Sequence, residues 1–202
     1  MKLYDYPDCP FGQKVRVVLA EKELEYDLAF VDLRKGEHKQ PDFLKLNPYG
    51  RVPVLIDEEV VVYDSTIINE YLEDEYPHPS LMPDESGGRA RVRLLEDFCD
   101  NSFLPSAGFV LAELNKPEGE QDADRLQRYR TELSRGLARL EGFLGSGGRE
   151  YLVGEYSLAD IAFVPAVLIL NRLGVEVDPR LRQVSAWIER LRARPGVQVL
   201  RL

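Results

Sequence analysis

Cys9 has the clearest potential for chemistry in this chain, because it stands directly before Pro10 and Phe11. Proline is favoured at the first position of a helix, so this order predicts a helix start with Cys9 at the N-cap. A thiol there lies near unpaired N–H groups and the positive end of the helix dipole, which lowers its pKa. We therefore expect a Cys9 thiolate near neutral pH. The alternative interpretation is a half-exposed loop cysteine without a role.

The redox pattern Cys-x-x-Cys is absent around Cys9, because Gly12 occupies its second cysteine position. A local dithiol mechanism is therefore excluded, whereas a mixed disulfide with an external thiol is open to Cys9. The second cysteine, Cys99, follows Phe98 on a long helical pattern and is expected to be a buried core thiol.

A second feature with chemical potential is the segment from Asn47 to Leu55. Its first four residues are typical of a turn, and Val54 and Leu55 then read as a buried strand. Pro53 stands at the strand start, where its missing N–H costs no ladder bond. Pro53 also holds Val52 extended, so the backbone of Val52 is free to pair with a peptide-like ligand.

Asp64 and Ser65 open a helical pattern some ten residues later. Free N–H groups and the dipole make a helix start suitable for binding a carboxylate. Asp64 would pair with a ligand's amino group, and Ser65 with its carboxylate. The alternative is that both residues only cap the helix. A strand edge beside such a helix start predicts a pocket for a small acidic peptide, and glutathione is such a peptide.

Other polar residues give weaker signals. Lys39 could reach the anionic end of a ligand, although a solvated surface lysine is the alternative. His38 and His78 have no partner at metal-ligand spacing, so no metal site is expected. Ser157 and Asp160 read as a structural capping box with Asp at the third helical position.

The elements that must position these residues fall into two groups. The first 75 or so residues alternate strands and helices in the order β-α-β-α-β-β-α, which predicts a small mixed sheet with helices packed on it. The predicted strands are residues 2–6, 26–33, 53–56 and 60–63, and the predicted helices are residues 11–22, 42–46 and a third that ends near 76. The last two strands form a hairpin that turns at residues 57–59.

The remainder of the chain predicts helices only. Three prolines and two glycines between residues 76 and 88 suggest a linker. Beyond it, helices are expected at residues 89–115, 123–144 and 157–170, and a last helix at 180–194 is stopped by Pro195 and Gly196. The run from 161 to 170 is too uniformly apolar for a surface helix and should be central to a bundle.

Composition narrows the classes of partner and compartment. A net charge of −9 argues against nucleic acid or an anionic membrane as the main partner, because both require a basic surface. No stretch approaches the roughly 18 apolar residues of a membrane span, and no signal-like segment is seen. Two cysteines suit a reducing cytosol, so a cytoplasmic location is expected.

Taken together, these motifs resemble the soluble glutathione transferase superfamily over essentially the whole chain. The resemblance implies an α/β thioredoxin-like N-terminal domain (residues 1–76), a linker (77–88) and an all-α helical-bundle C-terminal domain (89–202). The cysteine before Pro10 resembles the cysteine-type, omega-like branch, in which cysteine replaces the tyrosine or serine that activates glutathione. Val52 and Pro53 match the family's valine and cis-proline.

The resemblance also implies roles for individual residues. Cys9 would be catalytic, with glutathione as co-substrate held by Phe11, Lys39, Val52, Pro53, Asp64 and Ser65. The acceptor site would lie between the domains, with Phe103, Phe109 and Tyr129 as candidates. A homodimer and a small electrophilic or disulfide substrate are implied as well.

Residues 17–22 and 76–83 also resemble the stringent starvation protein A family, whose members keep the fold but regulate RNA polymerase. Pro77, His78 and Pro79 reproduce the surface implicated there in partner contact. The alternative is a stiff linker. Members of that family generally lack the cysteine, which is present here.

The leading prediction is therefore a glutathione-dependent transferase that performs thiol transfer or reductive deglutathionylation through Cys9. Conjugation of glutathione to electrophiles is the weaker reaction, because the cysteine thiolate would compete with the sulfur of glutathione. A non-enzymatic regulator that binds RNA polymerase is the alternative. A glutathione-dependent isomerase or dehalogenase is a third possibility, and it would tolerate serine in place of Cys9.

Overall fold

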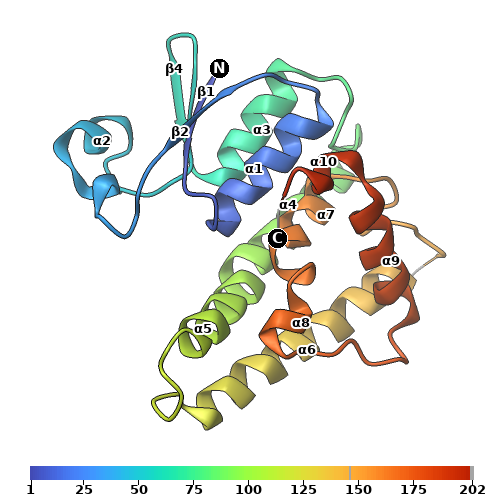
Figure 1. Ribbon diagram of the computed structural model, residues 1–202. Helices are drawn as coiled ribbons and strands as arrows, with labels where there is room; N and C mark the ends of the chain where they lie inside the picture. Colours follow the sequence, from blue (N-terminus) through green and yellow to red (C-terminus); the bar gives the residue numbers. More distant parts are fainter. Residues whose placement is uncertain (146, 201–202) are drawn as a thin grey trace. The chain divides into compact units, whose positions relative to one another are not determined.

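The computed structural model describes residues 1–145 and 147–200, and they form two compact units. The first unit runs from Met1 to Ser80 and includes a short C-terminal helix, α10 (Pro195–Gln198). The second unit runs from Leu81 to Arg194 and is built from helices (Figure 1). The thioredoxin-like and helical fold classes expected from the sequence are confirmed.

The first unit contains a four-stranded mixed sheet in the order β2-β1-β3-β4. β1 and β2 are parallel, whereas β1–β3 and β3–β4 are antiparallel. The predicted order of strands and helices is confirmed, with each boundary within a few residues. Its elements are β1 (Lys2–Asp5), α1 (Pro10–Glu21), β2 (Asp27–Phe30), the 3-10 turn η1 (Glu37–Lys39), α2 (Pro41–Leu46), β3 (Val54–Asp57), β4 (Val60–Tyr63) and α3 (Ser65–Glu75).

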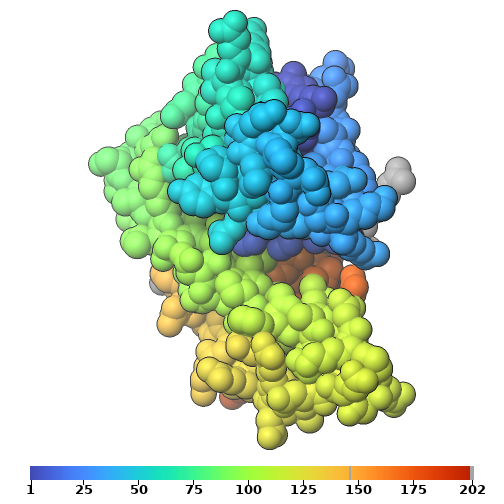
Figure 2. Space-filling view, turned by 90° about the vertical axis from the view of Figure 1, so that its left-hand side faces the viewer, coloured from blue at the N-terminus to red at the C-terminus, as the bar shows by residue number. Residues whose placement is uncertain are grey.

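Helices cover both faces of this sheet. α1 and α3 pack against each other on one face (Figure 1). The α1 valines 15, 17 and 18 are fully buried. On the other face, Phe43 of α2 packs with Val31, Val52 and Val54, and Cys9 lies against this cluster. The segment that carries η1 and α2 forms a sky-blue stretch of the unit's surface in Figure 2. Cys9 and Val52 therefore share one small core.

The second unit consists of α4 (Ser86–Phe98), the π-helical turn η2 (Cys99–Phe103), α5 (Leu104–Leu114), α6 (Ala123–Gly145), α7 (Leu158–Val167), α8 (Leu170–Leu173) and α9 (Arg182–Ala193). The single helix predicted over residues 89–115 is interrupted by η2. Pro105 in the first turn of α5 lacks an N–H donor, which suits a change in the hydrogen-bonding pattern there.

α7 is the centre of the helical unit, as its sequence predicts. Every residue from Leu158 to Val167 is buried. Cys99 is fully buried and its thiol donates to the carbonyl of Ala162 at 3.1 Å, so the expected core thiol is confirmed. Phe103 is only 2% exposed and its ring contacts Phe163, so it belongs to the core of this unit.

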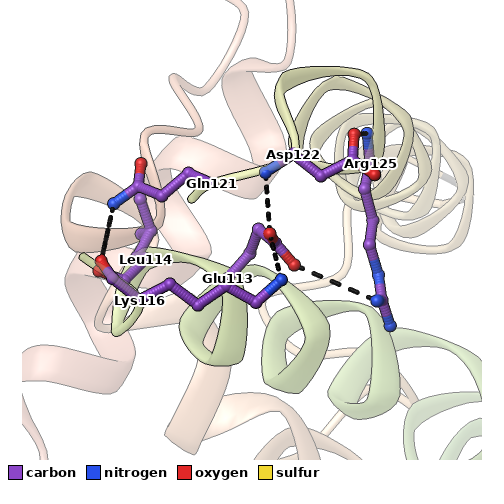
Figure 3. Close-up of polar contacts among 6 residues, drawn as sticks. All are labelled: Glu113, Leu114, Lys116, Gln121, Asp122 and Arg125. Atoms are coloured by element: carbon purple, nitrogen blue, oxygen red, sulfur yellow. Dashed lines mark hydrogen bonds and ion pairs between the residues drawn. The ribbon is translucent and has the colours of Figure 1, made fainter. Parts of the chain in front are cut away.

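A buried carboxylate fixes the connection between α5 and α6 (Figure 3). Glu113 accepts hydrogen bonds from Lys116 Nζ at 2.6 Å and from the backbone N–H of Asp122 at 2.7 Å. Arg125 Nη1 lies 4.0 Å from the same carboxylate, and Gln121 donates to the carbonyl of Lys116 at 3.2 Å. These donors, led by the Lys116 ammonium, lower the pKa of Glu113. Glu113 of α5 therefore fixes the conformation of the polar loop between α5 and α6.

The end of the chain differs from the sequence-based expectation. α9 does stop before Pro195, but Pro195 begins the further helix α10 rather than ending the helical structure. Proline is favourable at this first position because its missing N–H would be unpaired there in any case. α10 packs against α1, and a Cβ on Gly196 would lie 2.5 Å from the side chain of Glu21. A helix of four residues is too short to show a periodic pattern, so the sequence did not reveal it.

Candidate functional site

The strand register gathers the predicted site residues at one end of the sheet of the first unit. Val54, the first residue of β3, pairs with Tyr4 of β1 and with Tyr63 of β4. Residues 52–53 precede β3 and residues 64–65 follow β4, so the antiparallel hairpin places them at the same end. Cys9 lies in the connection that leaves β1 at that end. The register therefore brings together motifs that are 55 residues apart in the sequence.

Cys9 is the N-cap of α1, and Pro10 occupies the first helical position, as predicted. The Cys9 N–H donates to the carbonyl of Tyr6 at 2.8 Å, which fixes the loop before the helix. The Cys9 Sγ lies 4.0 Å from the carbonyl oxygen of Val52. The thiol therefore points at the backbone of the segment that the sequence marked as a peptide-binding edge.

The predicted low pKa of Cys9 is wrong for the ligand-free protein. The pKa of this thiol is raised to about 11, mainly by burial and to a smaller extent by the carboxylate of Asp5. The backbone N–H groups of Gly12 and Phe11 and the charge of Arg16 act in the opposite direction. The N-cap position thus has the expected sign, but desolvation outweighs it because the thiol is packed into the Val52 cluster.

The Val52–Pro53 peptide bond is cis, as the family resemblance implies. Val52 is 8% exposed and precedes β3, so its backbone lies outside the ladder with β1. Asn47 fixes the preceding turn, because its side chain donates to the carbonyl of Arg51 at 2.7 Å and accepts from the N–H of Tyr49 at 3.0 Å. The turn therefore presents the segment at Val52 in a defined conformation.

Lys39 is attached to the same turn. Its ammonium donates to the carbonyl of Gly50 at 3.0 Å and lies 3.4 Å from that of Tyr49. Gly50 has a φ of +58°, and a Cβ there would lie 2.8 Å from the carbonyl of His38. Glycine is thus required for η1 to approach this turn. Lys39 is exposed, and its contact residue Gly50 stands two residues before Val52 in the sequence.

Asp64 is the N-cap of α3 and has a φ of +76°. Its Oδ1 accepts the N–H groups of Thr66 at 3.0 Å and Ile67 at 3.4 Å, so the capping role foreseen for Asp64 is present. The side chain is exposed, whereas Ser65 is 3% exposed. Asp64 therefore places a negative charge at the site surface in addition to capping the helix.

Three further aromatic residues predicted for the site, Phe11, Phe109 and Tyr129, lie on helices. Phe11 is half-buried, with the Lys14 ammonium 5.6 Å from the centre of its ring. Phe109 and Tyr129 stack in the helical unit with ring centres 4.5 Å apart. Within residues 1–145 and 147–200, no cluster of His, Cys, Asp and Glu is suited to a metal ion. No described helix combines the length and apolar character needed to cross a membrane.

Sequence reasoning missed Asp5, which is fully buried beside Arg16 of α1. It also took the capping box as a complete account of Asp160, which is incomplete. Asp160 does accept the Ser157 N–H at 3.0 Å, but it further accepts the N–H of Leu152 and the indole N–H of Trp187. Gly12 was the signal that could have indicated the buried position of Asp5. This glycine in the first turn of α1 leaves room for the Asp5 carboxylate.

Comparison with known proteins identifies the class. The chain matches the family model "Glutathione S-transferase, N-terminal domain" over residues 1–74 and "Glutathione S-transferase, C-terminal domain" over residues 75–195. It therefore belongs to the glutathione S-transferase family.

Its relatives within the family carry different names. It is 36% identical to a maleylacetoacetate isomerase of Pseudomonas aeruginosa, covering 92% of this chain and 89% of that protein. It is 34% identical to glutathione S-transferase 3 of Zea mays, covering 98% and 91%. A stringent starvation protein A homolog of Coxiella burnetii is 32% identical, covering 89% and 80%. A zeta-class transferase of Euphorbia esula is also similar, so membership of the omega-like branch stays a prediction.

Solved structures agree with the fold. Ure2p in complex with glutathione matches 98% of this chain and 91% of its own, with a TM-score of 0.88 and 26% identity. The holo structure of a maleyl pyruvate isomerase, described as a bacterial zeta-class transferase, matches 98% and 95%, with a TM-score of 0.83 and 29% identity. The expected glutathione transferase fold is confirmed.

Proposed function

We propose that this chain binds glutathione at the end of the sheet where Cys9, Val52 and Asp64 gather. The backbone of Val52 would pair with the cysteinyl part of the peptide, because Val52 lies outside the ladder of β3. Asp64 would pair with the α-amino group of the γ-glutamyl end, and Ser65 with its α-carboxylate. Family membership and the glutathione complex of Ure2p support this proposal.

The other predicted binding residues surround this core. Lys39 would attract the opposite carboxylate of glutathione, since its ammonium is exposed beside the turn at Gly50. Phe11 and Pro53 would flank the peptide. A small disulfide or electrophile would be the second substrate, and a homodimer is proposed on the family resemblance alone.

The reaction we propose is thiol transfer through Cys9. Cys9 loses its proton and attacks the glutathione sulfur of a mixed disulfide, which forms Cys9–S–S–glutathione and releases the other partner as a thiol. A second glutathione then attacks this intermediate, giving glutathione disulfide and restoring the Cys9 thiol. The observation that carries the proposal is the 4.0 Å contact between Cys9 Sγ and the Val52 carbonyl. This contact puts the thiol beside the backbone that would hold the cysteinyl part of the ligand.

Replacement of Asp64 by asparagine tests glutathione binding. Asparagine keeps a side-chain acceptor for the Thr66 N–H but removes the charge that would pair with the α-amino group. A charged hydrogen bond contributes about 1.5–3 kcal/mol, so we expect roughly tenfold to a hundredfold weaker binding. Titration calorimetry with reduced glutathione measures it, with thermal unfolding as a check that the cap is kept.

Asp42 provides the matched control, since its side chain is exposed and pairs only with Lys45 in the contacts described. The change Asp42→Asn should leave the affinity for glutathione within about twofold, as expected of a surface ion pair. No binding by the unaltered protein, or equal losses in both variants, would contradict the proposed site.

A second candidate function is glutathione-dependent isomerisation. The observation that favours it is the raised pKa of Cys9, because a thiol that stays protonated can donate a hydrogen bond to the sulfur of bound glutathione. The maleylacetoacetate isomerase relative at 36% identity supports the same reading. In that case Cys9 would stabilise a glutathione thiolate and would form no disulfide.

A third candidate is a regulator of RNA polymerase, supported by the segment around His78. Lys22 is buried and donates to the carbonyls of Tyr76 at 2.7 Å and Pro79 at 2.9 Å, while pairing with Glu73. These contacts hold an exposed loop with His78 at its surface. Stringent starvation protein A homologs are among the relatives.

Replacement of His78 by alanine separates the regulator from the enzyme. If the loop is a docking surface, the variant should lose at least about tenfold in RNA polymerase retained in a pull-down, as for a central interface residue. Thiol transfer should stay unchanged, because His78 is not among the residues at the proposed glutathione site. Equal retention of polymerase by both proteins would remove the regulator from consideration.

A further inference from the structure

The first unit contains a buried ion pair between Asp5 and Arg16, close in sequence to Cys9. Asp5, the last residue of β1, is fully buried, and its Oδ2 is 3.2 Å from Nε of Arg16 on α1. The Arg16 side chain is 14% exposed, so the pair is largely screened from water. A buried carboxylate interacts strongly with nearby ionisable groups, because little solvent lies between them.

Gly12 shows how close this carboxylate lies to the turn that carries Cys9. A Cβ built on Gly12 would lie only 1.8 Å from Asp5 Oδ1, so the carboxylate rests directly against the backbone of the first turn of α1. The same turn begins at Cys9, whose carbonyl accepts the N–H of Gln13 at 2.9 Å. Asp5 and Cys9 therefore flank one helical turn.

The pair also fixes the loop before the helix. Arg16 Nη2 donates to the carbonyl of Pro7 at 2.5 Å, and Gln13 Nε2 donates to the same oxygen at 3.3 Å. Arg16 thus joins the Asp5 carboxylate to the loop that leads into Cys9. The position of this pair is therefore set by contacts within β1, α1 and the loop between them.

We propose that the Asp5–Arg16 pair controls the reactivity of Cys9, with the Asp5 carboxylate opposing loss of the thiol proton and Arg16 limiting that effect. The proposal deepens the proposed function, because it rests on Cys9 as the reacting thiol. Asp5 would act through the Cys9 thiol and would not itself touch the substrate. Burial is the main reason that Cys9 stays protonated in the free protein at neutral pH, and the Asp5 carboxylate adds to it.

The ionisation of Asp5 determines the pH range in which its carboxylate opposes loss of the Cys9 proton. The pKa of Asp5 is raised to about 6, because the effect of burial exceeds the lowering by Arg16 and by the Tyr6 N–H. Tyr26 also faces the pair, and its pKa is raised mainly by burial and further by Asp5. Asp5 is therefore charged above about pH 6 and neutral below it. Opposition to the Cys9 thiolate should be present above that pH and vanish as Asp5 takes up its proton.

The test is the rate at which a methanethiosulfonate reagent modifies Cys9 between pH 5 and pH 9, followed by mass spectrometry of the peptide that contains Cys9. In Asp5→Asn we expect a rate roughly threefold to tenfold above that of the unaltered protein at pH 8, from the loss of one nearby like charge. At pH 5 the two rates should converge, because Asp5 is then neutral in both proteins. The ratio should change around pH 6.

The controls separate charge from structure. Asp27→Asn alters an exposed acid on β2 and should leave the rate unchanged at every pH. Should Asp5→Asn fail to fold, the unaltered protein alone still tests the proposal: its logarithmic rate should rise with a slope below one near pH 6. A straight line of unit slope, or a variant whose rate ratio is constant with pH, would overturn it. The reaction needs no glutathione, so this outcome is independent of whether glutathione binds.

Discussion

Replacing Cys9 with serine should reduce thiol transfer by roughly a thousandfold or more, because a hydroxyl oxygen cannot form the mixed disulfide that both steps require. Glutathione affinity should change by less than about threefold, because the peptide is held by Val52, Asp64 and Ser65. The measurement is glutathione-dependent reduction of a small mixed disulfide, with calorimetry on the same variant for the affinity.

Cys99 supplies the matched control for this substitution, since it is fully buried in the helical unit and hydrogen-bonded to Ala162. Cys99→Ser should leave thiol transfer close to that of the unaltered protein. The Cys9→Ser variant also discriminates between the two enzymatic candidates, because serine can still donate a hydrogen bond to a glutathione thiolate. Thiol transfer that survives in Cys9→Ser would rule out the proposed mechanism, and isomerisation that survives would favour the second candidate.

Replacing Asp160 with asparagine should destabilise the helical unit by about 2–4 kcal/mol, the largest stability effect expected here. Both carboxylate oxygens are occupied: Oδ1 accepts from Leu152 and Trp187, and Oδ2 accepts the N–H and the hydroxyl of Ser157. The amide nitrogen of asparagine is a donor, so on either side it would face at least one donor without an acceptor. Asp160 is completely buried, so water cannot take the place of the lost acceptor.

Denaturant unfolding measures this loss, and Ser157→Ala is its control. Alanine at position 157 removes the hydroxyl while the backbone N–H continues to donate to Asp160, so about 1 kcal/mol is expected. An Asp160→Asn variant no less stable than Ser157→Ala would show that the indole and Leu152 contacts add nothing to the capping box.

The local elements of this chain were predictable because short-range signals specify them. The proline after Cys9 marks the start of α1, and the turn chemistry around Asn47 marks the segment before β3. Two short apolar runs joined by the turn at residues 57–59 predicted the hairpin of β3 and β4, and the uniformly apolar run after Ser157 predicted the buried helix α7. Each of these features depends on residues within about one turn or one strand of each other.

The positions of the candidate site residues on their helices and strands could be predicted from the sequence, but the ionisation of Cys9 could not. The sequence by itself determined that Cys9 stands at the N-cap position of α1, that Val52 and Pro53 stand at a strand start, and that Asp64 stands at the start of α3. The cis form of the Val52–Pro53 bond was implied by the family resemblance. The sequence also determined that the polar groups of these motifs stand at the ends of elements. None of these statements requires knowledge of what lies across the fold.

Only the tertiary structure decided the ionisation of Cys9 and the partners of the buried carboxylates. The thiol is desolvated by Val52, 43 residues away in sequence, and it lies across one helical turn from the charge of Asp5. Asp160 likewise acquires the indole of Trp187 from a helix 27 residues further along the chain. Desolvation and Coulomb interactions depend on distances in space and on the exclusion of water, and a local sequence pattern contains neither quantity.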